Sequence, residues 1–207
     1  MAAAGLLVFL AAGGLLWSRN IARGIWFLVF EGGALGVMVW TSGPLTLAVA
    51  VIGAVTMIVK AGLIPYVMHR VMHRWPQEFR QDSSLPLWAY GMAALLVLAV
   101  THAMHLLAST GIMLHQALFF YGLATIHWGL LMVVSRRHVL SQVAALVSVE
   151  NGLVILAASV AGALPTFMEL GMLGDLLVAA GLLVWMSWRI HHHLQSTDVA
   201  TLKQLRG

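Results

Sequence analysis

The sequence predicts an all-α, polytopic membrane protein, and three observations support this prediction. Of the 207 residues, 61% are hydrophobic and only 9% are charged, whereas a soluble domain carries about 25% charged residues. The mean hydropathy is +0.93. The apolar residues form long stretches without the alternation of barrel strands, so each stretch is expected to be a helix that satisfies its own backbone hydrogen bonds. This composition excludes an ordinary soluble domain and a disordered chain.

About seven segments approach or exceed the roughly 20 residues that a helix needs to cross the hydrocarbon core. Short polar or Gly/Pro-containing connections separate them, except for one longer cytoplasmic loop. The predicted spans are 2–17, 21–41, 44–68, 86–108, 111–134, 138–161 and 166–190. We expect one integral membrane domain over 1–207, made of a three-helix unit (1–68), the loop (69–85), a two-helix middle (86–134), a helix pair (135–190) and a tail (191–207).

The distribution of basic residues predicts the orientation. Ten of the 11 Lys and Arg residues fall in the first, third and fifth connections or at the C-terminal end, which share one side in a seven-span chain. The positive-inside rule places that side in the cytoplasm. We therefore expect the N-terminus outside, the C-terminus in the cytoplasm and the protein in the cell inner membrane. The pI near 10.1 then reflects topology in the lipid bilayer and does not call for a nucleic-acid partner.

Residue types that are absent from the sequence exclude several kinds of catalytic and metal site. The chain has no cysteine, which excludes thiol nucleophiles, Cys-ligated zinc or iron–sulfur clusters and thiolate-attached haem. No nucleophile motif, phosphate loop or metal-ligand cluster is recognisable either. We therefore expect no catalytic site, metal or cofactor in this chain, and its function has to lie in the few polar residues within the spans.

Four ionisable residues, Glu31, Lys60, Glu150 and Asp175, lie within predicted spans near the membrane midplane. Such a group costs about 2.5–3.5 kcal/mol at the bilayer centre on insertion scales, and its presence by default indicates function. Because a poorly solvated carboxyl group can exchange protons near neutral pH, these residues are candidates for proton transfer. The alternative is that Glu31 and Lys60 form a buried ion pair that only locks two helices together.

Four histidines, His102, His105, His115 and His127, lie in the fourth and fifth predicted spans. Each could be a neutral residue bonded to a neighbouring helix, or a secondary proton relay, since imidazole titrates near neutral pH. A third possibility is axial ligation of b-type haem, which would make the chain a haem-binding anchor of an oxidoreductase. His115 and His127 are about 18 Å apart on one helix and could only serve different haems.

The second and sixth predicted spans resemble each other. Each begins after a basic turn and continues as an apolar run to a mid-membrane glutamate, in Glu31-Gly32-Gly33 and in Glu150-Asn151-Gly152. Four spans separate the two units, so the copies run in the same direction through the membrane. The pattern indicates a parallel internal repeat.

A resemblance to a known family is carried by three segments near the C-terminus: VSRRHVLSQVAALVSVENGLVILAA, MELGMLGDLLVAAGLLVWMSWRI and DVATLKQLRG. They resemble the last part of component E of hydrogenase-4-type complexes, the membrane nickel–iron hydrogenase and formate hydrogenlyase assemblies. The segment MIVKAGLIPYVM resembles the third-span motif of the same family, a lysine followed five residues later by proline. The C-terminal part is also similar to the small K subunit of complex I and to the small C component of Mrp-type sodium/proton antiporters.

The resemblance implies a subunit of an energy-converting redox complex, without a redox centre of its own. It would lie between antiporter-like membrane subunits and the membrane subunit that contacts a peripheral redox arm. In the wider family two acids on successive helices belong to a hydrophilic proton axis; Glu150 takes the first place, and Asp175 the second, where glutamate is usual. Glu31 and Lys60 lie in the half that the K subunits lack. A purely structural adaptor is the alternative function.

Overall fold

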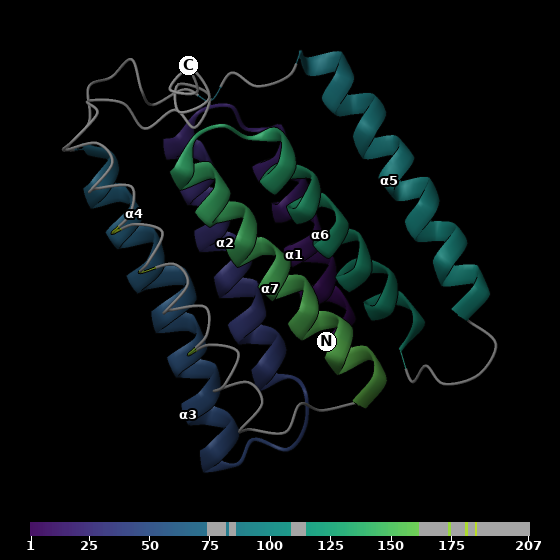
Figure 1. Cartoon of the computed structure of the whole chain (residues 1–207). Coiled ribbons are helices and arrows are strands. Elements are labelled where there is room, and N and C mark those ends of the chain that lie inside the picture. Colours follow the sequence, from purple (N-terminus) through teal and green to yellow (C-terminus); the bar gives the residue numbers. More distant parts are fainter. Residues whose placement is uncertain are drawn as a thin grey trace.

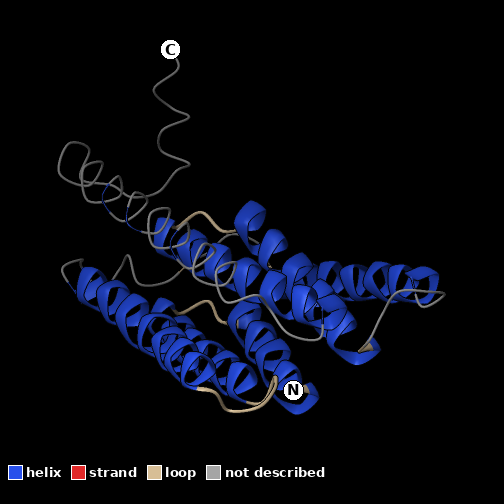
Figure 2. Cartoon of the chain, turned by 90° about the horizontal axis from the view of Figure 1, so that it is seen from below, coloured by secondary structure: helices blue, strands red, loops and turns tan. Residues whose placement is uncertain are grey.

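The computed structural model describes residues 1–73, 86–108 and 115–161, together with Asp82, Gly174, Gly181 and Trp185. Within these residues the chain forms helices joined by short loops, with no strand (Figures 1 and 2). The predicted all-α class is therefore confirmed for this part of the chain.

The helices follow the predicted order, with their ends displaced by a few residues. They are α1 (Ala2–Trp17), α2 (Ile21–Trp40), α3 (Leu47–Thr56), the π-helix η1 (Met57–Leu63), α4 (Ile64–His73), α5 (Leu87–Ala108), α6 (Gln116–Ser135) and α7 (Val139–Ala161). Since α3, η1 and α4 form one continuous helix over Leu47–His73, five helices of the described chain are long and apolar enough to cross a membrane.

Two of the predicted spans differ from the others in what the structure shows. The first, α1, is apolar but has only 16 residues. The seventh, predicted over 166–190, lies outside the described residues except for Gly174, Gly181 and Trp185. The third span also extends further than predicted, because α4 continues to His73 into the segment that we expected to be a loop.

Two helix hairpins, α1–α2 and α6–α7, form the centre of the described structure. Helix α1 packs against α2 and α6, and α2 packs against α7 and η1, whereas α5 packs mainly against α6 (Figure 1). Helices α6 and α7 approach each other closely through glycines: a Cβ added to Gly122 would lie 2.6 Å from the Leu156 nitrogen, and one added to Gly152 would lie 2.8 Å from the Ile126 nitrogen. Small residues allow such contacts between apolar helices, which gain little from hydrophobic burial inside a bilayer.

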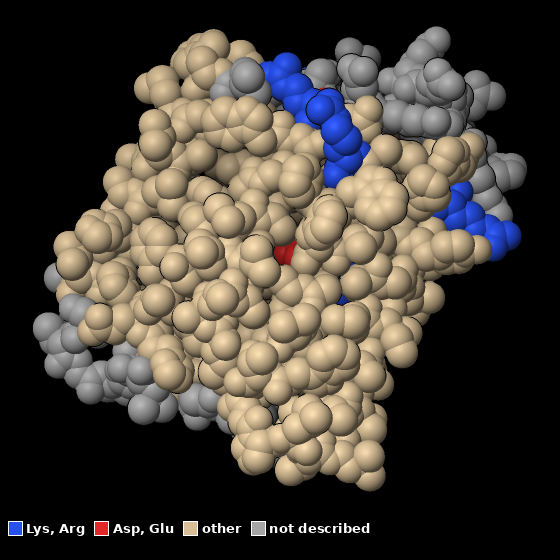
Figure 3. Space-filling model, turned by 180° about the vertical axis from the view of Figure 1, so that it is seen from behind, with Lys and Arg blue, Asp and Glu red and all other residues tan. Residues whose placement is uncertain are grey.

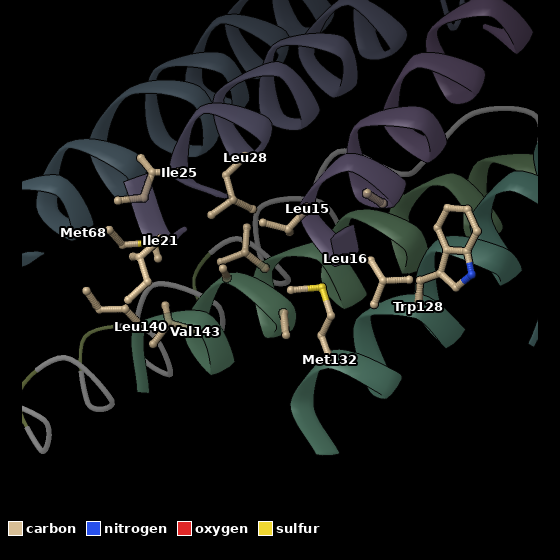
Figure 4. Close-up of a cluster of buried hydrophobic side chains, with 14 of the residues drawn as sticks. Leu15, Leu16, Ile21, Ile25, Leu28, Met68, Trp128, Met132, Leu140 and Val143 are labelled. Atoms are coloured by element: carbon tan, nitrogen blue, oxygen red, sulfur yellow. The ribbon is translucent and has the colours of Figure 1, made fainter. Parts of the chain in front are cut away.

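The buried apolar side chains form two clusters. The larger joins α1, α2, α4, α5, α6 and α7 near the turns that begin α2 and α7, and it includes Leu16, Ile25, Met68 and Leu140 (Figure 4). The smaller lies near the opposite ends of α2 and α7 and includes Val8, Leu35, Leu118, Val154 and Ile155. Polar residues of α2 and α7 lie between these two clusters.

The turns that begin α2 and α7 are tied together at one end of the bundle. The Asn20 side chain caps α2 by accepting hydrogen bonds from the backbone of Ala22 (2.9 Å) and Arg23 (3.3 Å). The Arg136 Nη2 donates to the Leu16 carbonyl at 2.6 Å. Asp82 links both turns. Its backbone nitrogen donates to the Arg19 carbonyl at 2.9 Å, and its carboxylate accepts hydrogen bonds from the backbone nitrogens of the two residues that precede α7, both at 3.4 Å.

The described arginines lie at this same end, which we call the basic end; they are Arg19, Arg23, Arg70, Arg136 and Arg137. The described arginines near the start of α2, in α4 and before α7 therefore share one end of the bundle. The space-filling view shows Lys and Arg mainly along the upper part of the molecule, above a broad surface of other residues in which one small area of red and one small area of blue are visible (Figure 3).

Candidate functional site

The site begins with a break in the regular hydrogen bonding of the third span. Pro65 has no backbone N–H and its ring would clash with the carbonyl four residues earlier in a regular helix. The preceding turns are wider: the Ile64 nitrogen donates to the Val59 carbonyl, five residues back, at the end of the π-helix Met57–Leu63. Lys60 lies in the middle of this π-helix and is 2% exposed. Single π turns inside α-helices occur frequently at functional sites.

Helix α2 approaches the π-helix so closely that only glycine fits at the contact. A Cβ added to Gly32 would lie 2.6 Å from the carbonyl carbon of Lys60 and 2.8 Å from the Ala61 nitrogen. Its chain neighbour Gly33 has no atom within 4 Å of the corresponding position. Gly32 thus brings the backbone of α2, and with it the adjacent Glu31, up to the segment that carries Lys60.

Lys60 reaches from the π-helix to two neighbouring residues of α7. Its Nζ forms an ion pair with the Glu150 carboxylate and donates a hydrogen bond to Asn151 Oδ1 at 2.9 Å. The Glu150 side chain is 12% exposed, and Asn151 is fully buried. A buried charge is tolerated only when it is paired and hydrogen-bonded, and α7 supplies both of these partners of Lys60.

Glu31 completes the group from α2. It is fully buried, and its Oε1 accepts a hydrogen bond from the Ser148 hydroxyl at 2.8 Å. It is close enough to Asn151, Lys60 and Glu150 to interact electrostatically with all three. Its second oxygen, Oε2, and the Asn151 Nδ2 are both buried and form no hydrogen bond of regular geometry, although the Glu31 and Asn151 side chains are close enough to interact.

These five residues form one polar layer; they are Glu31, Lys60, Ser148, Glu150 and Asn151. The layer lies between the two apolar clusters, because on α2 it is flanked by Leu28 and Leu35 and on α7 by Val147 and Val154. It holds two carboxyl groups and one amine, so it is electrically neutral when one of the two carboxyl groups carries a proton. In a poorly solvated place this neutral form is favoured, and the layer can therefore hold one exchangeable proton.

The structure changes the ion pair that the sequence suggested. Lys60 pairs with Glu150 of α7, whereas we expected a possible Glu31–Lys60 pair. Three of the four predicted proton-transfer residues, Glu31, Lys60 and Glu150, come together, and Asp175 lies outside the described residues. Sequence reasoning missed Ser148 and Asn151. Their signal is present in the sequence, since they lie within two residues of Glu150 in the middle of a largely apolar span.

The two glutamates of the predicted repeat meet in this layer. The hairpins α1–α2 and α6–α7 contact each other through the corresponding helices, α1 with α6 and α2 with α7. Glu31 and Glu150 occupy corresponding positions on parallel helices, as the predicted parallel repeat requires. The correspondence ends one residue later, because Gly32 makes the close contact on α2 whereas Gly152, the counterpart of Gly33, makes it on α7.

The four histidines lie on α5, on α6 or just before α6, away from the polar layer. The Nδ1 of His127 is 3.0 Å from the Thr101 hydroxyl across the α5–α6 contact. His105 packs against Phe119 and Phe120 with ring centroids 6.1 and 6.0 Å apart. His102 and His115 are exposed. For His127 this arrangement matches the interpretation of a histidine bonded to a neighbouring helix.

Among the residues that the structure describes, no group of three or more His, Asp or Glu side chains is placed to hold a metal ion. The polar layer is thus an arrangement of acids, amine and amide without a recognisable metal centre in this part of the chain. Comparison with protein-family models, with curated proteins and with solved structures finds no match for this chain.

Proposed function

We propose that this protein is a membrane subunit of an energy-converting redox complex of the hydrogenase-4 or complex I type, in which it carries protons. The observation that supports the proposal is the polar layer, where Glu31 from α2, Lys60 from η1 and Glu150 from α7 converge between two apolar clusters. Acidic and basic side chains that pair with one another inside a membrane are typical of proton relays.

Three properties of the layer favour proton carriage over a static lock. Two carboxyl groups share one amine, so protonation of the layer is adjustable. Glu31 Oε2 and Asn151 Nδ2 are buried, form no hydrogen bond of regular geometry and belong to side chains close enough to interact, so the hydrogen bonds within the layer can rearrange. Lys60 is held by a π-helix, which is less regular than an α-helix and commonly occurs where function outweighs stability.

The proposal includes the orientation and the partners that the sequence suggests. The basic end faces the cytoplasm of a cell with the protein in its inner membrane. Asp175, on the predicted seventh span, is the next acid of the path. Antiporter-like membrane subunits lie on one side, and a membrane subunit that contacts the peripheral redox arm lies on the other. Redox chemistry takes place in that arm.

A structural adaptor is the second candidate, because the ion pair itself joins η1 to α7 and could act only as a link between helices. The two functions differ in what neutral substitutions do. A link can be replaced by uncharged side chains that pack well, whereas a proton carrier cannot.

The decisive experiment measures proton uptake and donor oxidation by the whole complex in sealed vesicles. We expect Glu150→Gln to abolish proton uptake while donor oxidation in the arm persists. The matched control is Thr125→Val, which removes a fully buried hydroxyl on the neighbouring helix α6 without touching a charge; it should leave proton uptake intact. Unchanged pumping in Glu150→Gln would disprove the proposal.

A variant with both charges neutralised keeps the test informative if the single variant does not assemble. Lys60→Gln/Glu150→Gln removes both members of the ion pair and leaves Glu31 as the remaining ionisable residue of the layer, which is uncharged when it carries a proton. If the double variant assembles and does not pump, proton carriage is supported. If it assembles and pumps normally, the pair is a structural link and the adaptor function is correct.

A further inference from the structure

A groove of about 300 Å³ runs along the outside of the bundle between α2 and the η1–α4 helix. Its walls are apolar, with Ile25 and Val29 on α2 and Ala61, Gly62 and Pro65 on the opposite side. Ala61 and Gly62 belong to the π-helix and directly follow Lys60. The groove therefore extends from the middle of the span towards the basic end.

Two aromatic side chains stand at the rim of this groove and are largely exposed. Trp26 is 64% exposed and Tyr66 is 59% exposed, and both line the groove. Trp and Tyr are enriched where a helix passes from hydrocarbon to the headgroup region of a bilayer, because their rings are apolar and their N–H or O–H is polar. A rim with these two side chains suits the level of lipid headgroups, and apolar walls below it suit the level of acyl chains.

The mouth of the groove carries positive charge. Arg23 is exposed and lies three residues before Trp26, on the same face of α2. The Arg70 Nη1 lies 3.4 Å from the Tyr66 hydroxyl. His69 lines the groove, and its Nε2 is 2.9 Å from that of His73. The described carboxylates are engaged elsewhere, Glu31 and Glu150 in the polar layer and Asp82 at the start of α7.

We propose that this groove binds one anionic phospholipid. Its phosphate would be held by Arg23 and Arg70 beside His69, and one acyl chain would lie along the apolar walls as far as the π-helix. From His69 to Ala61 the groove follows eight residues of helix, about 12 Å at 1.5 Å per residue. The volume suits a slender chain, since pockets for small ligands begin near 300 Å³, whereas an α-helix of a partner protein is about 10–12 Å across.

The experiment uses the purified full chain in a mild neutral detergent and follows tryptophan fluorescence. Phosphatidylglycerol and phosphatidylcholine, each with brominated acyl chains, are titrated separately, because bromine quenches only nearby indoles. The chain has eight tryptophans, so the signal of the groove is the quenching that is lost in Trp26→Phe. We expect saturable quenching by phosphatidylglycerol at a lower concentration than by phosphatidylcholine.

Arginine variants test the headgroup contact. A basic residue near an anionic surface contributes about 1 kcal/mol, which corresponds to an affinity change of about fivefold. Arg23→Gln and Arg70→Gln should therefore each weaken binding of phosphatidylglycerol about fivefold, and Arg70→Lys should retain most of it. The matched control is Arg137→Gln, since Arg137 is exposed at the same end but belongs to the turn before α7.

Lipid binding in the groove is independent of proton carriage and is tested separately from it. Equal quenching by the two lipids, or quenching that Trp26→Phe does not change, would overturn the proposed site. Equal loss of affinity in Arg137→Gln and Arg70→Gln would also overturn it. Such a result would show that the basic end attracts anionic lipid through its overall charge and that the groove is not a specific binding site.

Discussion

The polar layer and the α5–α6 contact both place titratable side chains within predicted spans, but they differ in how many helices surround them. In the central part of α7, which carries Glu150, 67% of the residues are buried, compared with 17% in α5, which carries His102 and His105. The carboxylates and the amine lie where α2, η1 and α7 meet, whereas His127 bonds to Thr101 across a contact of two helices.

The difference follows from the energy of each group. A charged carboxylate or ammonium inside an apolar environment needs a partner and several hydrogen bonds, and here a contact of three helices provides them. A histidine can be neutral and needs at most one or two hydrogen bonds, so the Thr101 hydroxyl of one neighbouring helix can satisfy a ring nitrogen of His127. Three substitutions can break or sharpen this comparison, and their expected effects decrease from Lys60 through Gly32 to Thr101.

Lys60→Met is expected to have the largest effect on stability. Removal of one partner of a buried ion pair leaves the other charge uncompensated and costs about 3–5 kcal/mol. Unfolding of the purified protein by a denaturing detergent would measure this loss. The double variant Lys60→Met/Glu150→Gln should recover most of it, and a double variant as unstable as Lys60→Met would show that the lysine acts through packing and not through charge.

Gly32→Ala should destabilise the protein by about 1–3 kcal/mol, the usual range for overpacking in a tight interior. The added Cβ would lie within 2.8 Å of backbone atoms of Lys60 and Ala61, which cannot move without shifting the π-helix. Gly33→Ala is the matched control, because nothing lies within 4 Å of its added Cβ. The same unfolding assay compares the pair, and equal stability of the two variants would contradict the close contact of α2 with η1.

Thr101→Val should have the smallest effect of the three. It removes the hydroxyl that contacts His127 Nδ1 while keeping the side-chain volume. Interhelical hydrogen bonds in membrane proteins contribute about 0.6 kcal/mol on average, and His127 is only partly buried. A loss of several kcal/mol in the unfolding assay would show that the Thr101–His127 contact contributes as much to the free energy of unfolding as the contacts of the polar layer do.

Much of the described fold follows from the sequence because hydrophobic length and backbone hydrogen bonding leave apolar segments few alternatives to a helix in lipid. The helices α1, α2, α5 and α7 begin within one residue of their predicted starts, since polar turns such as Ser18-Arg19-Asn20 interrupt the apolar runs. The extension of α4 to His73 was not predicted, because a segment that contains Arg70 is typical of a surface loop when its neighbours in space are unknown.

For the candidate site, the sequence predicts less than it does for the helices, and the packing of the helices decides more. The sequence alone identifies Glu31, Lys60 and Glu150, because ionisable residues in long apolar runs are costly and therefore conspicuous. It does not identify their partners, since Lys60 and Glu150 are 90 residues apart along the chain and any buried acid could have paired with the lysine. Only the packing of α2, η1 and α7, set by glycine contacts and by the π-helix before Pro65, decided that Lys60 pairs with Glu150 and that Ser148 bonds to Glu31.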